Sequence, residues 1–406
     1  MKAVQFLISV PRYVFGLIGG KISPTAFTSR FSCVQYREVP EPELLGPDWV
    51  KIKTRYGVIC GSDLGMIKLH DSPSLSPFGA EVFTIGHEQV GTIVEVGENV
   101  TGFKVGQRVT VDPLLPCPTR GIESPCPHCQ AEEWSRCENW AEGGLPGLEL
   151  GNNADTGGSW SPYFLAHQFQ LFAVPDTVSD ENAALVDAFC SALHAVMRSF
   201  PQDGDTVLVI GGGVIGICVV AALRVLESKA RILVLAKYPF QGEWAEHYGA
   251  DEVICLGRGD YYQRVAELTS GRLYKPILGK RAMVGGADVV YECVGADDTT
   301  DDALRFTRAG GRLALVGLIA QTKKVDWTPV WFKELTVVGT LASSTETYRG
   351  QRKRCYQLAL DWMAEGKLDL NPLLTHTFRL EEYRKALTTA MHKGRTGYVK
   401  GAFVFD

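Results

Sequence analysis

The sequence lacks long apolar runs, a strong excess of charge of either sign, internal repeats and low-complexity tracts. No stretch of about 18 apolar residues occurs in its 406 residues, so we expect no transmembrane span. The formal net charge is −5, which provides no basic footprint for DNA, RNA or an anionic membrane. These absences argue against nucleic-acid and membrane partners and leave small molecules as the expected ligands.

The cysteines do not form the pattern of a disulfide-stapled secreted protein. Eleven is an odd number, and four of them lie between positions 117 and 137. Reduced, metal-binding cysteines in the cytosol fit this distribution better than a disulfide framework. The N-terminal stretch could imitate a signal peptide, but Pro11, Arg12 and Lys21 interrupt it. We therefore expect a cytoplasmic protein whose first strand is followed by a short amphipathic insertion.

The pattern that is present indicates two domains. Over the first 170 residues, short β-type runs such as 50–54 and 91–97 alternate with glycine turns, which predicts a β-rich, partly open barrel. From about residue 181, buried strands such as 206–210 alternate with helices such as 214–226. This second pattern predicts an α/β fold with a doubly wound parallel sheet. A helix over 351–364 and a strand over 398–400 follow.

A glycine-rich turn joins the strand 206–210 to the helix after it. The turn contains Gly211, Gly213, Val214, Ile215 and Gly216 in a G-x-G-x-x-G pattern. In such a loop the glycines allow a tight turn, a close approach of the backbone to a pyrophosphate, and close packing of helix on strand. The helix N-terminus adds free N–H groups and a partial positive charge. This strand–turn–helix context predicts a dinucleotide site.

The next strand lacks the acidic residue that binds the ribose 2′-hydroxyl of NAD in many such domains. Ala236 and Lys237 stand at that place instead. Without a carboxylate there is no repulsion against a 2′-phosphate, and Lys237 could pair with it. The sequence therefore favours NADP over NAD. The alternative is that Lys237 is a solvated surface lysine.

Cys60, His87 and Glu88 combine sulfur, nitrogen and oxygen donors, each set among glycines. Zn²⁺ accepts all three donor types, and a catalytic zinc keeps one coordination position open. Mg²⁺ and Ca²⁺ prefer oxygen, so the cysteine and the histidine argue against them. Taken alone, Cys60 and His87 could equally be a buried cysteine and a core histidine that never meet.

A second cysteine group contains Cys117, Cys126, Cys129 and Cys137. Four thiolates around a loop match a closed, tetrahedral structural zinc site, which pins a loop too poor in apolar surface to order itself. A redox role for the Cys-x-x-Cys pair is the alternative, but the pair lies in a proline-rich loop without a βαβ context. His128 competes as a ligand, although its place between two cysteines favours a solvent-facing side chain.

Together these motifs resemble the zinc-dependent medium-chain alcohol dehydrogenases, especially the polyol and threonine dehydrogenase branch. Residues 57–63 and 86–88 are similar to the catalytic zinc signature of that family, and residues 111–117 to the entry of its structural lobe. Residues 184–195 are similar to the segment that carries the third catalytic ligand. This branch has a carboxylate there, which puts Asp187 in that place, with Cys190 as the weaker candidate.

The resemblance implies a domain order as well as a ligand set. It implies a GroES-like β-rich catalytic domain with the structural-zinc lobe at 1–188, a Rossmann dinucleotide-binding domain at 189–342, and a return to the catalytic domain at 343–406. It further implies one catalytic and one structural Zn²⁺, and a homodimer or homotetramer.

The chain departs from the family pattern in three places. About six extra residues separate Cys117 from Cys126, so Glu123 is the reserve candidate for the fourth structural ligand. Gly65 stands where many relatives have a histidine that passes the proton to solvent, which leaves the cofactor ribose, ordered water or His70 as routes. The connection over residues 7–30 is longer than usual.

Within the ligand set Cys60, His87 and Asp187, the neighbouring side chains receive supporting roles. Ser62 is placed to take the substrate proton, or else it only caps the next turn. Asp63 is expected to orient His87 by accepting its second ring N–H. Glu88 either alternates with water on zinc or acts outside the ligand set.

The first hypothesis is a zinc-dependent oxidoreductase that transfers hydride between a secondary alcohol or polyol, or the matching carbonyl compound, and NADP or NAD. The alternatives are a non-catalytic nucleotide-binding relative and a zinc-free NADPH-dependent carbonyl or enone reductase. The intact ligand set argues against both.

Overall fold

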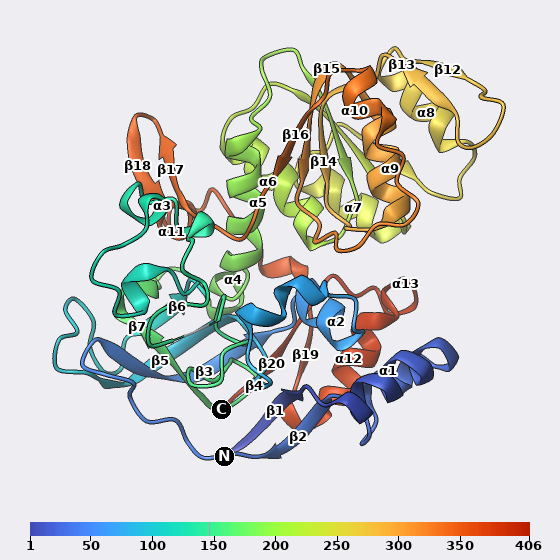
Figure 1. Cartoon of the computed structure of the whole chain (residues 1–406). Coiled ribbons are helices and arrows are strands. Elements are labelled where there is room, and N and C mark those ends of the chain that lie inside the picture. Colours follow the sequence, from blue (N-terminus) through green and yellow to red (C-terminus); the bar gives the residue numbers. More distant parts are fainter. Residues whose placement is uncertain (146) are drawn as a thin grey trace. The chain divides into compact units, whose positions relative to one another are not determined.

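The computed structural model describes residues 1–145 and 147–406. The chain forms two compact units. Unit 1 contains Met1–Asp187 and Ala342–Asp406, and unit 2 contains Ala188–Leu341. Figure 1 shows unit 1 as mostly strands and short helices, and unit 2 as a sheet covered by helices.

Unit 1 is built on a seven-stranded sheet whose order is β19-β20-β3-β5-β6-β8, with β7 also paired to β3. β3 runs antiparallel to β5, while β19 and β20 are parallel to each other. Alternate residues of β3 point into the core, because Val50 and Ile52 are fully buried. The strands are β3 (Trp49–Val58), β5 (Glu88–Val96), β6 (Arg108–Val111), β7 (Tyr163–His167), β8 (Leu171–Ala173), β19 (Leu374–Phe378) and β20 (Lys400–Val404).

A second, three-stranded sheet of unit 1 has the order β2-β1-β4, with bounds β1 (Lys2–Leu7), β2 (Val34–Glu38) and β4 (Val82–Thr84). The long connection between β1 and β2 contains the helix α1 (Val10–Ile22) and the short 3₁₀ helix η1 (Pro24–Thr28). α12 (Tyr383–Met391) packs on η1, and α13 (Lys393–Thr396) follows it. The insertion expected from the sequence is therefore a helix packed on η1.

Unit 2 is a six-stranded parallel sheet of order β11-β10-β9-β14-β15-β16, which confirms the doubly wound sheet predicted from the sequence. With β9 as strand 1, this is the strand order 3-2-1-4-5-6 of a dinucleotide-binding fold. The strands are β9 (Thr206–Ile210), β10 (Arg231–Ala236), β11 (Glu252–Cys255), β14 (Ala287–Glu292), β15 (Thr307–Leu315) and β16 (Thr336–Gly339). The covering helices include α6 (Val214–Val225), α7 (Pro239–His247), α8 (Tyr261–Leu268) and α9 (Asp297–Phe306).

Two predicted elements differ in their bounds. The helix expected from residue 351 begins at Cys355 as α11 (Cys355–Ala364), because residues Gln351–Arg354 form β18 and pair with β17 (Thr345–Tyr348). The final strand begins at Lys400 rather than at residue 398. The local hairpin of β17 and β18 decides the first bound, and the pairing of β20 with β19 and β3 decides the second.

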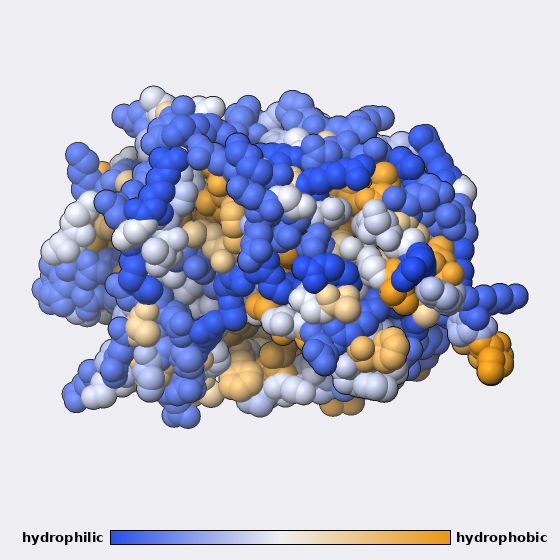
Figure 2. All heavy atoms as spheres, turned by 90° about the horizontal axis from the view of Figure 1, so that it is seen from above, coloured by the Kyte–Doolittle hydropathy of each residue, from blue (hydrophilic) through white to orange (hydrophobic). Residues whose placement is uncertain are grey.

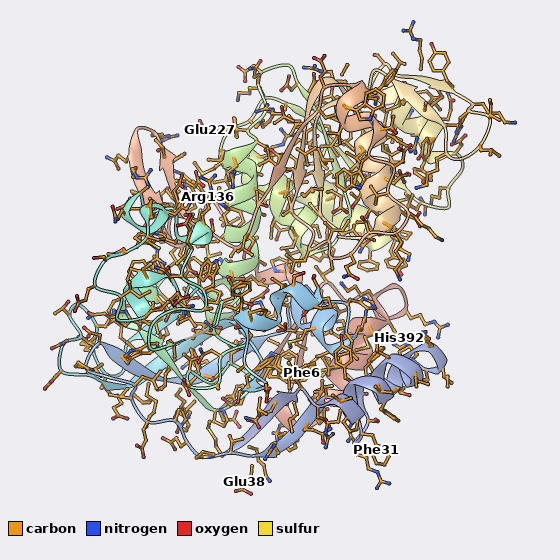
Figure 3. The ribbon with its side chains drawn as sticks, viewed as in Figure 1. Phe6, Phe31, Glu38, Arg136, Glu227 and His392 are labelled. Atoms are coloured by element: carbon orange, nitrogen blue, oxygen red, sulfur yellow. The ribbon has the colours of Figure 1, made fainter. Side chains whose placement is uncertain are left out.

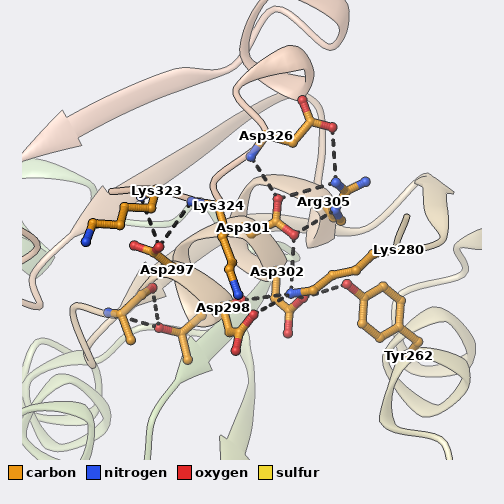
Figure 4. Close-up of polar contacts among 12 residues, drawn as sticks. Tyr262, Lys280, Asp297, Asp298, Asp301, Asp302, Arg305, Lys323, Lys324 and Asp326 are labelled. Atoms are coloured by element: carbon orange, nitrogen blue, oxygen red, sulfur yellow. Dashed lines mark hydrogen bonds and ion pairs between the residues drawn. The ribbon is translucent and has the colours of Figure 1, made fainter. Parts of the chain in front are cut away.

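An acidic cluster on α9 ties the surrounding segments of unit 2 to that helix (Figure 4). Lys280 forms ion pairs with Asp301 at 3.2 Å and with Asp302 at 2.9 Å. Arg305 pairs with Asp301 one helical turn away, and Asp297 accepts the backbone N–H groups of residues 323 and 324. Every carboxylate named here has a cationic or N–H partner, so the cluster is a packing device.

The face drawn in Figure 2 is mostly hydrophilic, with smaller apolar groups between the charged side chains. Among the residues that the structure describes, no helix has the length and apolar character needed to cross a membrane.

Candidate active site

The strand β3 delivers Cys60 to the start of α2 (Gly61–Ile67), and His87 and Glu88 stand at the start of β5. β3 and β5 are paired at this end, with Val58 opposite Glu88. This pairing brings together the ligand atoms of Cys60, His87 and Glu88, which all lie within 4.8 Å of one another. The alternative that Cys60 and His87 never meet is therefore wrong.

His87 is oriented from both sides of its ring. Its Nδ1 lies 3.3 Å from a carboxylate oxygen of Asp63, and its Nε2 lies 3.3 Å from the hydroxyl of Ser62. The other oxygen of Asp63 accepts the backbone N–H of Cys60 at 2.8 Å, which locks Asp63 in place. An Nδ1–H donated to Asp63 leaves Nε2 as the lone-pair donor on the side of Cys60 and Ser62.

Electrostatics around His87 favour a positive charge at this place. Burial lowers the pKa of His87, but Glu149, Asp63 and Cys60 together hold it well above its ordinary value. The pKa of the Cys60 thiol is raised, first by burial and then by the Glu88 carboxylate. A cation bound between Cys60 and Glu88 would reduce the repulsion between thiolate and carboxylate and offset the cost of burying both charges.

Glu88 is almost completely buried and is paired with a lysine that the sequence analysis did not single out. The ammonium of Lys400 lies 2.7 Å from each oxygen of Glu88, and the two side chains are 2% and 1% exposed. Burial raises the pKa of Glu88, but Lys400 outweighs it and the pKa is lowered. A buried carboxylate beside a thiol and an imidazole fits the donor set of a metal ion.

Asp187 lies near this group but outside it. Its carboxylate accepts a hydrogen bond from the hydroxyl of Tyr356. Burial, followed by the Glu88 charge, raises its pKa to about 7. The geometry thus brings Glu88, rather than Asp187, to Cys60 and His87, and the predicted third ligand is not among the three convergent atoms. Cys190, the weaker candidate, is buried in α5 (Val186–Arg198) and is also not among them.

The space beside Gly65 is bordered by a carboxylate. A side chain at Gly65 would begin 3.6 Å from an oxygen of Asp71, whose pKa is raised by burial and by Asp63. The sequence indicates His70 as a proton route instead. The pKa of His70 is lowered by burial and by Lys68. Asp71 was missed because neither its spacing nor its neighbours in the chain distinguish it from a loop aspartate.

The four cysteines of the second group converge as predicted, with all sulfur atoms within 4.8 Å of one another. The sulfurs of Cys117 and Cys137 are 3.7 Å apart, and all four cysteines are free. This separation is too long for a disulfide. It matches the roughly 3.8 Å edge of a tetrahedron with zinc–sulfur bonds of about 2.3 Å.

Polar hydrogens point at these sulfurs, as thiolates require. Cys117 accepts from the backbone N–H of Cys126 at 3.4 Å and from the side-chain amide of Asn139 at 3.2 Å. Glu123 does not belong to the group, so the extra residues before Cys126 form a bulge without displacing Cys117. His128 is paired with Glu133 at 2.8 Å and is partly exposed, as the sequence indicated.

In unit 2 the glycine-rich loop has the form that a dinucleotide site needs. Gly211 has φ of 106°, a left-handed conformation that favours glycine. A side chain at Gly216 would begin 1.8 Å from the carbonyl oxygen of Gly211, so only glycine fits. Gly213 is different, because a side chain there would meet nothing within 4 Å. Its missing side chain leaves open space at the N-terminus of α6, where no side chain caps the helix.

Lys237 follows the last residue of β10, Ala236, and is exposed. Its backbone N–H donates to the side chain of Gln241, and its ammonium lies 5.7 Å from the ring centre of Tyr238. The adjacent strand β11 ends in register with β10, since Ala236 is opposite Cys255. Arg258 is exposed and follows the end of β11 by three residues.

Comparison with known proteins agrees with this geometry. Residues 46–176 match the model of the alcohol dehydrogenase GroES-like domain, and residues 214–365 match that of the zinc-binding dehydrogenases. A sorbitol dehydrogenase of Halalkalibacterium halodurans is 32% identical over 351 residues, which cover 86% of this chain and 90% of that protein. The chain belongs to the zinc-dependent medium-chain alcohol dehydrogenase family. It is therefore an oxidoreductase that uses a nicotinamide cofactor, which confirms the resemblance seen in the sequence.

Further relatives lie in the same branch. An L-threonine 3-dehydrogenase of Photorhabdus laumondii is 30% identical and covers 89% of this chain and 94% of its own length. Among solved structures, 2R,3R-butanediol dehydrogenase from Bacillus subtilis has a TM-score of 0.71 at 25% identity and covers 100% of this chain and 99% of its own. A Sinorhizobium meliloti protein described as a zinc-binding dehydrogenase, solved with NADP bound, has a TM-score of 0.71 at 26% identity, with coverages of 92% and 95%.

Proposed function

We propose that this family member oxidises a secondary alcohol or polyol, and reduces the matching carbonyl compound, with NADP as the preferred cofactor. The observation that carries the proposal is the convergence of Cys60, His87 and Glu88 within 4.8 Å, with the Ser62 hydroxyl beside His87. Sorbitol and butanediol dehydrogenases among the relatives support the substrate class.

We propose a catalytic zinc held by Cys60, His87 and a carboxylate, and a structural zinc held by the four cysteines. Glu88 is supported as that carboxylate by its distance to the other two donors, while Asp187 stays the alternative implied by the family resemblance. When bound, a catalytic zinc lowers the pKa of a substrate hydroxyl and polarises a substrate carbonyl.

The remaining residues then act on the substrate proton. The Ser62 hydroxyl lies 3.3 Å from Nε2 of the ligand histidine, so it is placed to accept a hydrogen bond from the substrate alcohol and receive its proton. Asp63 holds His87 in the tautomer that leaves Nε2 free for a metal. Asp71, beside Gly65, is the acid–base group that we propose for the onward transfer of the proton, in place of the missing histidine.

The preference for NADP rests on the end of β10. Ala236 leaves no carboxylate to repel a 2′-phosphate, and Lys237 and Arg258 are exposed cations beyond the ends of two adjacent parallel strands. The NADP-bound relative supports this reading. We also propose that unit 1 is the catalytic domain and unit 2 the nucleotide-binding domain, in a homodimer or homotetramer; the unit boundaries lie one residue before the 188/189 and 342/343 expected from the sequence.

Purified chain should be assayed with a panel of secondary alcohols and polyols, using NADP and NAD in parallel, together with its zinc content. We expect turnover that Cys60→Ser abolishes while the fold and cofactor binding remain, and Lys237→Asp should shift the preference from NADP to NAD. Cys255→Ser, half-buried in β11, is the matched control. Full activity after complete zinc removal would refute the proposal in favour of a zinc-free reductase. Cofactor binding without any turnover on the panel would favour the non-catalytic alternative.

A further inference from the structure

The insertion between β1 and β2 holds a helix that docks through glycines. In α1, a side chain at Gly16 would begin 2.8 Å from Leu69, and one at Gly20 would begin 2.1 Å from the ring of Phe27. Arg12 donates to the carbonyl oxygens of Arg30 and Ser32, which ties the helix to the segment that returns to β2. α1 is therefore held firmly on its glycine side, close to the backbone beneath it.

The opposite side of α1 is apolar and exposed to solvent. Residues three or four positions apart lie on one face of a helix, and a surface helix normally turns its apolar face to the core. Here the reverse holds, since Ile18 is 61% exposed and Ile22 is 83% exposed. The exposed apolar residues of this segment are Ile8, Val10, Val14, Phe15, Leu17, Ile18, Ile22 and Phe31. α1 and α12 both pack on η1, and Figure 3 shows Phe31 pointing away from the ribbon near α1.

Charge within the insertion itself is of one sign. No aspartate or glutamate occurs before Glu38, whereas Arg12, Lys21 and Arg30 lie within the insertion. The helices α12 and α13 add the exposed cations Arg384, Lys385 and Arg395. Carboxylates of the neighbouring segments include those of Asp71, which follows Leu69 by two residues, of Glu81, whose carbonyl accepts from Ile8, and of Glu382, which is paired with Lys385. The net charge of −5 for the whole chain therefore conceals a local basic and apolar surface.

We propose that α1 is an interfacial helix that binds this enzyme to an anionic lipid surface. Apolar side chains on one face with lysine and arginine beside them and no acidic residue is the composition of helices that lie in the headgroup region. A second copy of the chain is disfavoured as the occupant. A two-fold contact through this face would bring the insertions of both copies together, each with Lys21 and Arg30 and neither with a carboxylate to offset these charges. The site of hydride transfer plays no part in this proposal.

Flotation of the full-length enzyme with vesicles of phosphatidylcholine, with and without phosphatidylglycerol, tests the proposal. We expect binding to the anionic vesicles alone and its loss at high salt. Leu17→Ser with Ile18→Ser should abolish flotation, and because both side chains are exposed, the fold should survive. Lys21→Glu should weaken vesicle binding by at least roughly fivefold for the charge that is lost. Val105→Ser, an equally exposed valine in a turn of unit 1, is the control.

Three results would overturn the proposal. The first is the absence of flotation of the natural chain with anionic vesicles, and the second is flotation of the Leu17→Ser, Ile18→Ser variant. The third is a molar mass by light scattering that differs between this variant and the natural chain, when the natural chain binds no vesicles. That result would assign the surface to a contact between copies of the chain. Dehydrogenase activity in solution should be the same for the natural chain and all three variants.

Discussion

Replacing Lys400 with methionine should destabilise unit 1 severely in the absence of zinc. Lys400 and Glu88 are 2% and 1% exposed and approach to 2.7 Å, so removing the ammonium leaves a carboxylate buried without a counter-ion. Loss of one partner of a buried ion pair costs about 3–5 kcal/mol. Unit 1 is large, and at roughly 2–4 °C per kcal/mol for domains of this size the melting temperature should fall by about 6–20 °C.

A matched surface pair sets the scale for this effect. Lys51 pairs with Glu95 at 2.8 Å, but the glutamate is 48% exposed. Lys51→Met should therefore change the free energy of unfolding by less than about 1 kcal/mol. The double variant Lys400→Met, Glu88→Gln should recover much of the loss, because it removes the unpaired charge as well.

Thermal unfolding followed by circular dichroism, with chelator and with added zinc, distinguishes the two possible counter-charges of Glu88, which are the Lys400 ammonium and a zinc ion. If Glu88 is a zinc ligand, bound metal replaces the missing ammonium as its counter-charge, so zinc should raise the melting temperature of Lys400→Met more than that of the natural chain. An equal effect of zinc on both proteins would refute Glu88 as a ligand. A Lys400→Met variant as stable as Lys51→Met would refute the buried pair itself.

Three further outcomes follow from the structure. Gly216→Ala should unfold unit 2, because its side chain would begin 1.8 Å from the Gly211 carbonyl oxygen, whereas Gly213→Ala should keep the fold and weaken cofactor binding, as measured by fluorescence titration. Cys137→Ser should reduce the zinc content by one ion per chain and leave the response of the Cys60–His87 site to added alcohol intact, whereas Cys255→Ser should leave the zinc content and that response unchanged. An unaltered zinc content of Cys137→Ser by mass spectrometry would contradict the structural site. Burial, aided by Arg305, lowers the pKa of Lys333 to about 8 from its ordinary 10.5, so the unfolded chain binds more protons between these values and stability should rise with pH there, by at most about 1.4 kcal/mol per pH unit. Lys333→Met should show a flatter profile in urea titrations over that range, and identical slopes would contradict the shift.

The features that the sequence predicts are those formed by residues close together in the chain. The strand–glycine–helix turn at 206–216 has one physical solution, because Gly211 and Gly216 each exclude any side chain. The four-cysteine group is equally readable, since thiolates at short spacing in one loop can converge without help from the rest of the fold. The parallel sheet of unit 2 follows from buried strands that alternate with helices.

The parts that sequence missed depend on pairing between distant segments. Lys400 reaches Glu88 only because β20 is paired with β3 and β3 with β5, a contact across 312 residues. The only sign of this pair in the sequence is Lys400 at the start of an otherwise apolar strand, and that position does not indicate Glu88 as its partner. Asp71 approaches Gly65 through the turn after α2, and the role of Tyr356 toward Asp187 depends on the packing of α11.

The surroundings of His87 connect the missed residues to the metal. Asp63, Glu88, Glu149 and Asp187 supply carboxylates around one imidazole, and Lys400 is engaged by Glu88. The pKa of Asp187 rises to about 7 and that of Glu149 is also raised, in both cases by burial first and with neighbouring carboxylates contributing. Such a set has more negative charge than its fixed cations offset, and buried charge without a counter-ion is unstable. A divalent cation between Cys60 and His87 supplies the missing charge at the point where these fields converge. A zinc ion held by Cys60 and His87 would compete with Lys400 for Glu88, and the outcome of that competition would decide between Glu88 and Asp187 as the third ligand.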